Sequence, residues 1–209
     1  QYKQASWSYT WGRQRSETFP FMATNHTFNP MQWGNFNWSH TNSGGTLDSI
    51  RSDLQSMPKP VHLMGFNEPD KTNQGFITVT NAIERWPRLL AMDSPLVSPV
   101  PAATSTNAGW LVDFMDQAGA LGHRVDQVAV HWYGNPDADG LINLLQSVYD
   151  KWQRPVWLTE FSPVRWSGTA TWSHADNFNF LAEFLWRAES LPWLARYSLF
   201  SFRESDGSD

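Results

Sequence analysis

The chain has 209 residues, enough for one domain with a buried core, and only 17% of them are charged, with a formal net charge of −5. This charge balance leaves no basic stripe to neutralise phosphates or anionic lipids, so nucleic acid and membrane surfaces are not expected partners. The absence of cysteine excludes a disulfide framework and a thiolate metal site.

The first 60 residues contain short strand-like segments with little room between them. They are Trp7 to Trp11, one segment within Phe19 to Asn25 or Asn29 to Trp33, and Asn35 to Ser39. A parallel crossover needs about a dozen residues, and the intervals here are shorter, so some outer helices should be missing from this half. Only Thr46 to Met57 has the apolar spacing of a helix in this region.

From residue 61 onward, apolar strands alternate with helical patterns. The predicted strands are Val61 to Phe66, Leu96 to Val100, Gln127 to Tyr133, Val156 to Glu160 and Ala195 to Phe202. Helical spacing of apolar residues lies between them, around residues 83–90, 110–118, 141–152 and 178–188. Pro87 should kink its helix or move the helix start later. The alternation predicts βαβ units with parallel strand pairing.

Counting these strands predicts an α/β fold of the (β/α)8 TIM-barrel type. Three strands come from the first 60 residues and five from the rest, whereas no helical pattern follows Phe202. We therefore expect one barrel domain over residues 1–209, incomplete, with reduced helices in its N-terminal half and no clear last helix.

Two glutamates, Glu68 and Glu160, follow directly on apolar strand-like runs. Catalytic groups collect at the carboxyl ends of parallel barrel strands. A pair of carboxylates there suggests glycoside hydrolysis, in which one carboxyl protonates the leaving oxygen and the other is ionised. The alternatives are a helix N-terminal carboxylate for Glu68, before Pro69, and a surface strand end for Glu160.

Three motifs surround these glutamates. They are Gly65-Phe66-Asn67-Glu68-Pro69-Asp70, Val130-His131-Trp132-Tyr133-Gly134 and Val156-Trp157-Leu158-Thr159-Glu160-Phe161. Together they resemble glycoside hydrolase family 128, a branch of the clan A (β/α)8 glycosidases that acts on β-1,3-glucan. The resemblance implies a retaining, secreted polysaccharide-degrading hydrolase of the endo-β-1,3-glucanase type, with exo action left open. It also implies that Glu68 is the general acid/base and Glu160 the nucleophile.

Several further residues are candidates for substrate binding. Asn67 could hydrogen-bond the sugar 2-OH, or it could simply form a turn. Tyr133 resembles the clan tyrosine that orients the nucleophile, and His131, two residues earlier on the same strand, should face the same way, unless it is a core histidine. Gln74 could line the groove.

Aromatic residues supply the remaining candidates, because thirteen tryptophans are more than packing requires and flat rings suit sugar faces. The predicted sugar platforms are Trp11, Trp33, Trp132, Trp166, Tyr9 and Phe202. The tryptophans on helical apolar faces are expected in the core: Trp86, Trp110, Trp152 and Trp186.

Metal and dinucleotide motifs are missing from the sequence, so we expect no metal and no cofactor. Two glycosylation sequons, Asn25-His26-Thr27 and Asn37-Trp38-Ser39, weakly support a secreted or cell-wall-associated protein whose signal peptide is not in this chain. β-1,3-Glucan is the expected partner, and we expect a monomer. Two alternatives remain open: a β-1,3-glucan-binding protein with little or no hydrolysis, and a clan A glycanase for another β-linked polysaccharide.

Overall fold

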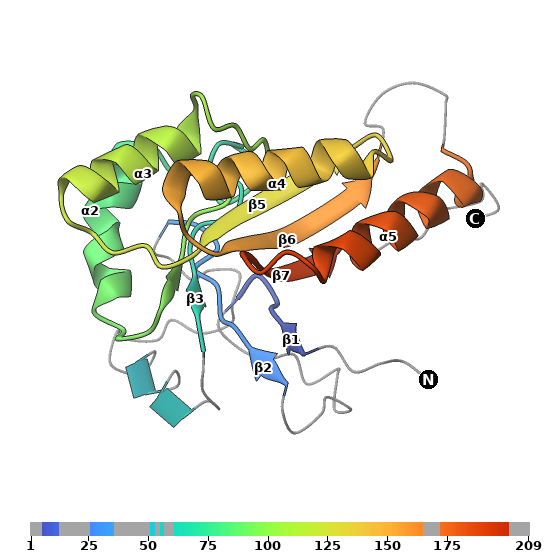
Figure 1. Ribbon diagram of the computed structural model, residues 1–209. Helices are drawn as coiled ribbons and strands as arrows, with labels where there is room; N and C mark the ends of the chain where they lie inside the picture. Colours follow the sequence, from blue (N-terminus) through green and yellow to red (C-terminus); the bar gives the residue numbers. More distant parts are fainter. Residues whose placement is uncertain are drawn as a thin grey trace. The chain divides into compact units, whose positions relative to one another are not determined.

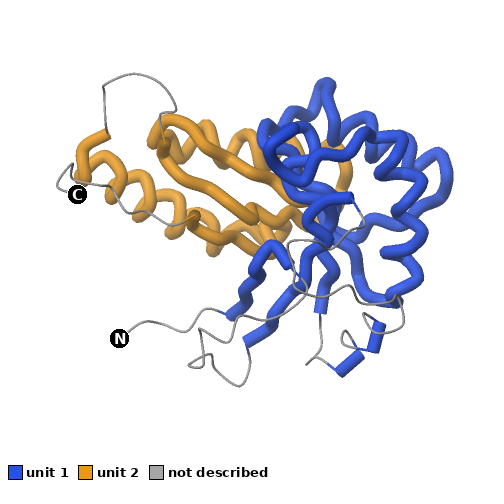
Figure 2. The backbone as a smooth tube through the Cα atoms, turned by 180° about the vertical axis from the view of Figure 1, so that it is seen from behind, with its two compact units in different colours: residues 1–128 blue, residues 129–209 orange. Residues whose placement is uncertain are grey.

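The computed structural model describes residues 6–12, 26–35, 51–52, 55–56, 61–164 and 172–200. The predicted segments Phe19 to Asn25, most of Asn35 to Ser39, and the chain after residue 200 lie outside these ranges, as do Trp166 and Phe202. The chain forms two compact units, Gln1–Val128 and Ala129–Asp209 (Figure 2). Each unit is described by itself.

The first unit contains parallel strands. Strand β1 (Trp7–Ser8) pairs with β2 (Thr27–Phe28), and β3 (Leu63–Met64) pairs with β4 (Leu96–Val97), both in parallel. Isolated parallel bridges extend this pairing: Met31 to Met64, Asn67 to Val100 and Val97 to Gln127. Strand β2 falls between the two ranges in which the sequence predicted it, and the Met31 bridge lies within the second.

Two helices of the first unit, α2 (Val79–Leu90) and α3 (Trp110–Ala120), pack on each other through aromatic rings. Thr78 caps α2, because its side chain accepts a hydrogen bond from the Asn81 backbone. Trp86 is fully buried, with its ring centroid 5.0 Å from that of Phe114 and its indole N–H donating to the Arg124 carbonyl at 2.9 Å. Trp86 therefore belongs to the core, as predicted.

Helix α2 begins earlier than its apolar pattern suggested and runs through Pro87. The Ala91 N–H still donates to the Pro87 carbonyl at 3.0 Å, so the proline sits in the last turn of a continuing helix. The expectation that Pro87 would move the helix start later was wrong. The caps decide the helix bounds here, because Thr78 satisfies the N-terminal amides well before the proline.

The second unit is built on a three-stranded sheet in the order β5–β6–β7 (Figure 1). Its strands are β5 (Val128–Gly134), which starts at the last residue of the first unit, β6 (Val156–Pro163) and β7 (Leu194–Leu199). β6 and β7 are parallel, and every residue of β6 is buried, as expected for a central parallel strand. Helix α4 (Ala138–Trp152) packs on β6 and on α5 (His174–Ala188).

Helix α5 buries only part of the apolar face that its sequence predicted. Its buried residues are Phe180, Phe184 and Ala188, spaced four apart, whereas Trp186 is 78% exposed. The prediction that Trp186 is a core residue was therefore wrong. The physical reason is the Phe180–Phe184 pair, which packs on Phe161 of β6 and so turns Trp186 to solvent.

In the described residues, no helix has the length and apolarity that crossing a membrane requires.

Two matched substitutions test this core. Replacing Trp86 with alanine should lower the free energy of unfolding by about 3–5 kcal/mol, because it opens a cavity and orphans the Arg124 carbonyl. Trp186→Ala should change it by less than about 0.5 kcal/mol, since most of that ring is already in water. Urea denaturation of both variants checks the pair, and equal losses would contradict the assigned faces.

Tyr197 of β7 should ionise late. Burial raises the pKa of Tyr197 to about 12, and its hydroxyl also hydrogen-bonds the Glu189 carboxylate, which follows α5. A raised folded-state pKa means that the folded protein holds this proton more tightly, so the contribution to stability is present below about pH 10 and is lost as the pH rises through about 12. Alkaline titration of tyrosinate absorbance should show one late group that disappears in Tyr197→Phe. A titration unchanged by that substitution would contradict the assignment.

Candidate active site

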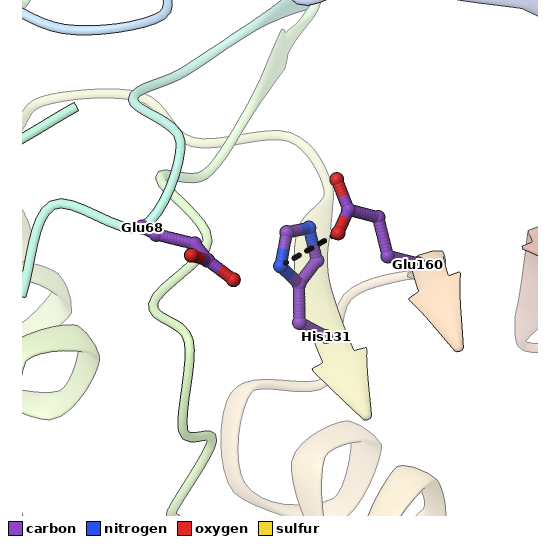
Figure 3. Close-up of side chains that lie close together, drawn as sticks. All are labelled: Glu68, His131 and Glu160. Carbon is purple, nitrogen blue, oxygen red and sulfur yellow. Dashed lines mark ion pairs between the residues drawn. The ribbon is translucent and has the colours of Figure 1, made fainter. Parts of the chain in front are cut away.

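In the second unit, two of the predicted residues, His131 and Tyr133, meet at the carboxylate of Glu160, the third. The Tyr133 hydroxyl donates a hydrogen bond to Glu160 Oε2 at 2.6 Å. His131 Nδ1 lies 3.5 Å from the same oxygen, as Figure 3 shows for this pair. His131 and Tyr133 reach Glu160 together because residues two apart on a strand share a face. Glu160 is only 6% exposed and His131 1%, so this contact is almost free of solvent.

The Tyr133 hydrogen bond selects one orientation of the carboxylate. A hydrogen bond to a charged acceptor contributes about 1.5–3 kcal/mol, more than a bond between neutral groups. It engages Oε2, the oxygen that His131 also approaches. Glu160 is thus a buried carboxylate with a fixed geometry, which is what a nucleophile or an electrostatic stabiliser requires.

Phe200, which the sequence analysis did not select, supports this cluster. Its ring lies edge-on to Tyr133 with centroids 5.8 Å apart, and its N–H donates to the Phe161 carbonyl at 3.0 Å. Phe202, the predicted platform, is outside the described residues. Strand alternation could have pointed to Phe200, because residues 200 and 202 share a face of an extended chain.

Trp132 lies on the other face of β5. Its ring stacks on Phe180 of α5 with centroids 5.3 Å apart, and Phe180 is 3% exposed. This placement favours a packing role for Trp132 over the predicted sugar contact. Alternation along β5 explains the difference, since the neighbours of Trp132 on both sides face Glu160.

In the first unit, Glu68 occupies a strained backbone position beyond β3. Its φ is +41°, in the left-handed region that costs a residue other than glycine about 1–3 kcal/mol. The Glu68 N–H donates to the Val100 carbonyl at 2.7 Å, and the Asn67 N–H donates to the Trp33 carbonyl at 2.8 Å. Backbone strain that the surroundings enforce in this way is typical of functional sites.

Asn67 contributes a buried acceptor next to Glu68. It is 3% exposed, and its amide oxygen has no hydrogen-bond partner among the described residues. An unpaired buried acceptor of this kind costs stability unless a ligand donates to it. Asn67 therefore offers a buried acceptor beside Glu68.

The segment after Glu68 folds back onto the strand end. Gln74, half-buried, donates its backbone N–H to the Lys71 carbonyl at 3.1 Å, and Gly75 donates to the Asn67 carbonyl at 3.0 Å. Trp33 is also half-buried. Sequence reasoning missed Gly75, because a glycine in a polar loop carries no signal until its neighbours in space are known.

Three aromatic residues, at positions 7, 9 and 11, lie next to one another in and just after β1. The rings of Trp7 and Tyr9 stack with centroids 5.9 Å apart, and Tyr9 meets Trp11 edge-on at 5.4 Å. Trp11 is 41% exposed and Tyr9 half-buried, so both keep surface that a ligand can cover. Trp166 lies outside the described residues.

Imidazole and carboxylate are both common metal ligands. His131 and Glu160 supply one group of each kind, 3.5 Å apart, whereas protein metal sites normally use three or more ligands.

Comparison with known proteins gives a family match over the whole chain. The model described as glycosyl hydrolase catalytic core matches residues 1–209. Alkali-sensitive linkage protein 1 of Schizosaccharomyces pombe (strain 972 / ATCC 24843) is 26% identical over 172 residues, or 78% of this chain. The chain spans only 28% of the length of that protein.

The solved structures similar to this chain include β-1,3-glucanases. A GH128 subgroup I endo-β-1,3-glucanase from Amycolatopsis mediterranei, in complex with laminaritriose and laminaribiose, is 30% identical with a TM-score of 0.80. The match covers 94% of this chain and 80% of that enzyme. A curdlan-specific exo-β-1,3-glucanase of subgroup III from Blastomyces gilchristii is 24% identical with a TM-score of 0.72, covering 93% and 80% of the two chains, and this second likeness shows the fold alone.

Proposed function

Because this chain belongs to glycoside hydrolase family 128, we propose that it hydrolyses β-1,3-glucan with retention of configuration. Glu160 is the nucleophile in this proposal and Glu68 the general acid/base. The observation that carries it is the buried Glu160 carboxylate, oriented by the Tyr133 hydroxyl at 2.6 Å. Sequence similarity supports the same proposal, because this chain is 30% identical to a β-1,3-glucanase in a match that covers 94% of it.

The reaction proceeds in two displacements. A Glu160 carboxylate oxygen attacks the anomeric carbon, the bond to the leaving glucosyl oxygen breaks, and the Glu68 carboxyl gives that oxygen its proton. A water molecule then attacks the same carbon, Glu68 takes a proton from the water, and the bond to Glu160 breaks. Two inversions restore the original configuration, which requires the carboxyl groups to lie about 5–5.5 Å apart.

The surroundings of Glu160 support its role as nucleophile. Attack needs an immobile carboxylate, and a buried carboxylate without a hydrogen-bond donor is costly. The hydrogen bond from the Tyr133 hydroxyl to Oε2 offsets that cost. His131 beside Oε2 adds a polar neighbour on the same side.

The surroundings of Glu68 support its role as acid/base. Its left-handed backbone holds it just beyond the end of β3, where the barrel strands of glycosidases carry such groups. The buried amide oxygen of Asn67 is available to the sugar 2-OH, a contact that strengthens as charge develops. In the Amycolatopsis mediterranei enzyme, structures exist with either of two glutamates replaced. Their separation along that chain is close to that of Glu68 and Glu160 here.

The remaining parts of the proposal follow from the family. Residues 1–209 make up one catalytic domain of the incomplete (β/α)8-barrel type that needs no cofactor. Trp33, Tyr9 and Trp11 contact glucosyl units, and Gln74 lines the groove. Related structures include both an endo- and an exo-β-1,3-glucanase, and we favour endo action because the subgroup I enzyme is the more similar in sequence. A secreted or cell-wall-associated protein would meet this polymeric substrate.

Replacing the nucleophile tests the proposal. Glu160→Ala should lower kcat on laminarin by at least about 10²-fold, because no covalent intermediate can form, while laminari-oligosaccharides still bind. Added azide should restore turnover and give the α-glycosyl azide, because it attacks from the face that Glu160 has vacated. Reducing-sugar release, calorimetry and product NMR supply the three measurements.

The matched control is Glu84→Ala, which removes an exposed carboxylate from α2 and should leave kcat unchanged. Undiminished hydrolysis by Glu160→Ala would remove the assignment. A wild-type protein that binds laminari-oligosaccharides without cleaving them would instead establish a glucan-binding role, and preferential cleavage of a β-1,4-linked polymer would establish a different substrate.

Tyr133→Phe isolates the hydrogen bond to Glu160. Removal of the hydroxyl should lower kcat about 10- to 100-fold with little change in KM, which corresponds to the 1.5–3 kcal/mol of a charged hydrogen bond. Tyr149→Phe, on α4, is the control and should retain full activity. Initial-rate kinetics on laminari-oligosaccharides decide the outcome, and a rise in KM with unchanged kcat would assign Tyr133 to substrate binding.

A further inference from the structure

The loop that follows Glu68 returns to its own starting point. The Lys71 N–H donates to the Glu68 carbonyl at 3.0 Å, and the Ile77 N–H donates to the Pro69 carbonyl at 3.2 Å. Between them, the Gly75 N–H donates to the Asn67 carbonyl at 3.0 Å. Gly75 thus closes the loop by contacting Asn67, the residue before Glu68.

Gly75 has no room for any side chain. A Cβ built on it would lie 2.0 Å from the Trp33 carbonyl oxygen and 2.4 Å from the Asn67 carbonyl oxygen. Both values are far below the closest approach of real Cβ atoms, and both neighbours are backbone. The φ of Gly75 is not in the left-handed region, so the constraint is space and not conformational freedom.

The two crowded oxygens belong to the hydrogen bonds that hold Glu68 in place. The Trp33 carbonyl accepts from the Asn67 N–H at 2.8 Å, and the Asn67 carbonyl accepts from Gly75. The next peptide carries Glu68, whose N–H is held by the Val100 carbonyl at 2.7 Å and whose φ is +41°. A side chain at position 75 must push the Trp33 and Asn67 carbonyls apart, and this movement turns the Asn67–Glu68 peptide.

We infer that Gly75 is a positioning residue for Glu68, acting through the Asn67 carbonyl to hold the acid/base in its strained conformation. The inference rests on the proposed function of Glu68. It differs from ordinary packing in its consequence, because displacing Glu68 impairs proton transfer and leaves the nucleophile untouched.

Gly34 forms the other wall of this contact. A Cβ on Gly34 would lie 3.1 Å from the Gly75 Cα, which is tight but not impossible. Gly34→Ala should therefore disturb the same point more gently than Gly75→Ala. Gly119, on α3, has open space around its Cβ position and no positive φ, so Gly119→Ala is a matched glycine control.

Substrates with different leaving groups separate acid displacement from general damage. A natural laminari-oligosaccharide needs its leaving oxygen protonated, whereas a dinitrophenyl β-laminarioside releases a stable phenolate without help. kcat/KM reports the glycosylation step for both. In Gly75→Ala, kcat/KM on the oligosaccharide should fall about 10²-fold, the size of effect that a misplacement of about 1 Å produces. On the dinitrophenyl substrate the fall should be much smaller, because it comes only from weakening of the contact between Asn67 and the sugar 2-OH.

Glu68→Gln is the reference for the loss of the acid, and it should show the same split with a larger fall on the oligosaccharide. Suppose that Glu68→Gln lowers kcat/KM more on the oligosaccharide than on the dinitrophenyl substrate. An equal fall in kcat/KM on both substrates in Gly75→Ala, or no fall on either, would then overturn the role of Gly75. If Glu68→Gln showed no split, the proposed function would fail and the inference with it. If Gly75→Ala did not fold, Gly34→Ala would have to show a smaller split, and its absence would overturn the inference.

Discussion

A short hydrogen bond between two neighbouring strands organises the second unit. Tyr133 on β5 donates to Glu160 on β6 at 2.6 Å, and strand pairing sets the distance across which it forms. A carboxylate as buried as Glu160 would be costly without such a donor. The helices contribute by holding the strand, since Phe180 and Phe184 of α5 pack on Phe161, the residue after Glu160.

The two glutamates are mounted in different ways. Glu160 lies within a fully buried strand, where extended geometry and packing leave its backbone little freedom. Glu68 lies beyond a two-residue strand, in a left-handed conformation that surrounding hydrogen bonds impose. Enzymes commonly carry one catalytic side chain on a rigid strand and another on a loop whose conformation is fixed by several hydrogen bonds. The loop-borne group depends on Gly75, which lies against the carbonyl of Asn67, the residue before Glu68.

The relatives place these features in a wider family. Identity of 30% with a TM-score of 0.79 to a β-1,3-glucanase means that the fold persists although most residues differ. The fungal protein matched at 26% identity is much longer, so the segment that resembles this chain is one part of it. An endo- and an exo-β-1,3-glucanase are both similar in fold to this chain, so the fold by itself does not decide between the two actions.

Local patterns in the sequence determined the α/β class, the parallel strands from residue 61 onward, and the shared orientation of His131 and Tyr133, because periods of 2 and 3.6 residues are properties of neighbouring positions. The tertiary structure alone decided which face of α5 is buried. Helix α5 carries apolar residues on all its sides, so periodicity could not show whether Phe180 or Trp186 is buried. Only the contact between Phe180 and Phe161 decided this. The space around Gly75 was likewise hidden, because the Trp33 and Asn67 carbonyls approach it from elsewhere in the chain. Such contacts arise from the packing of distant segments, which no local pattern encodes.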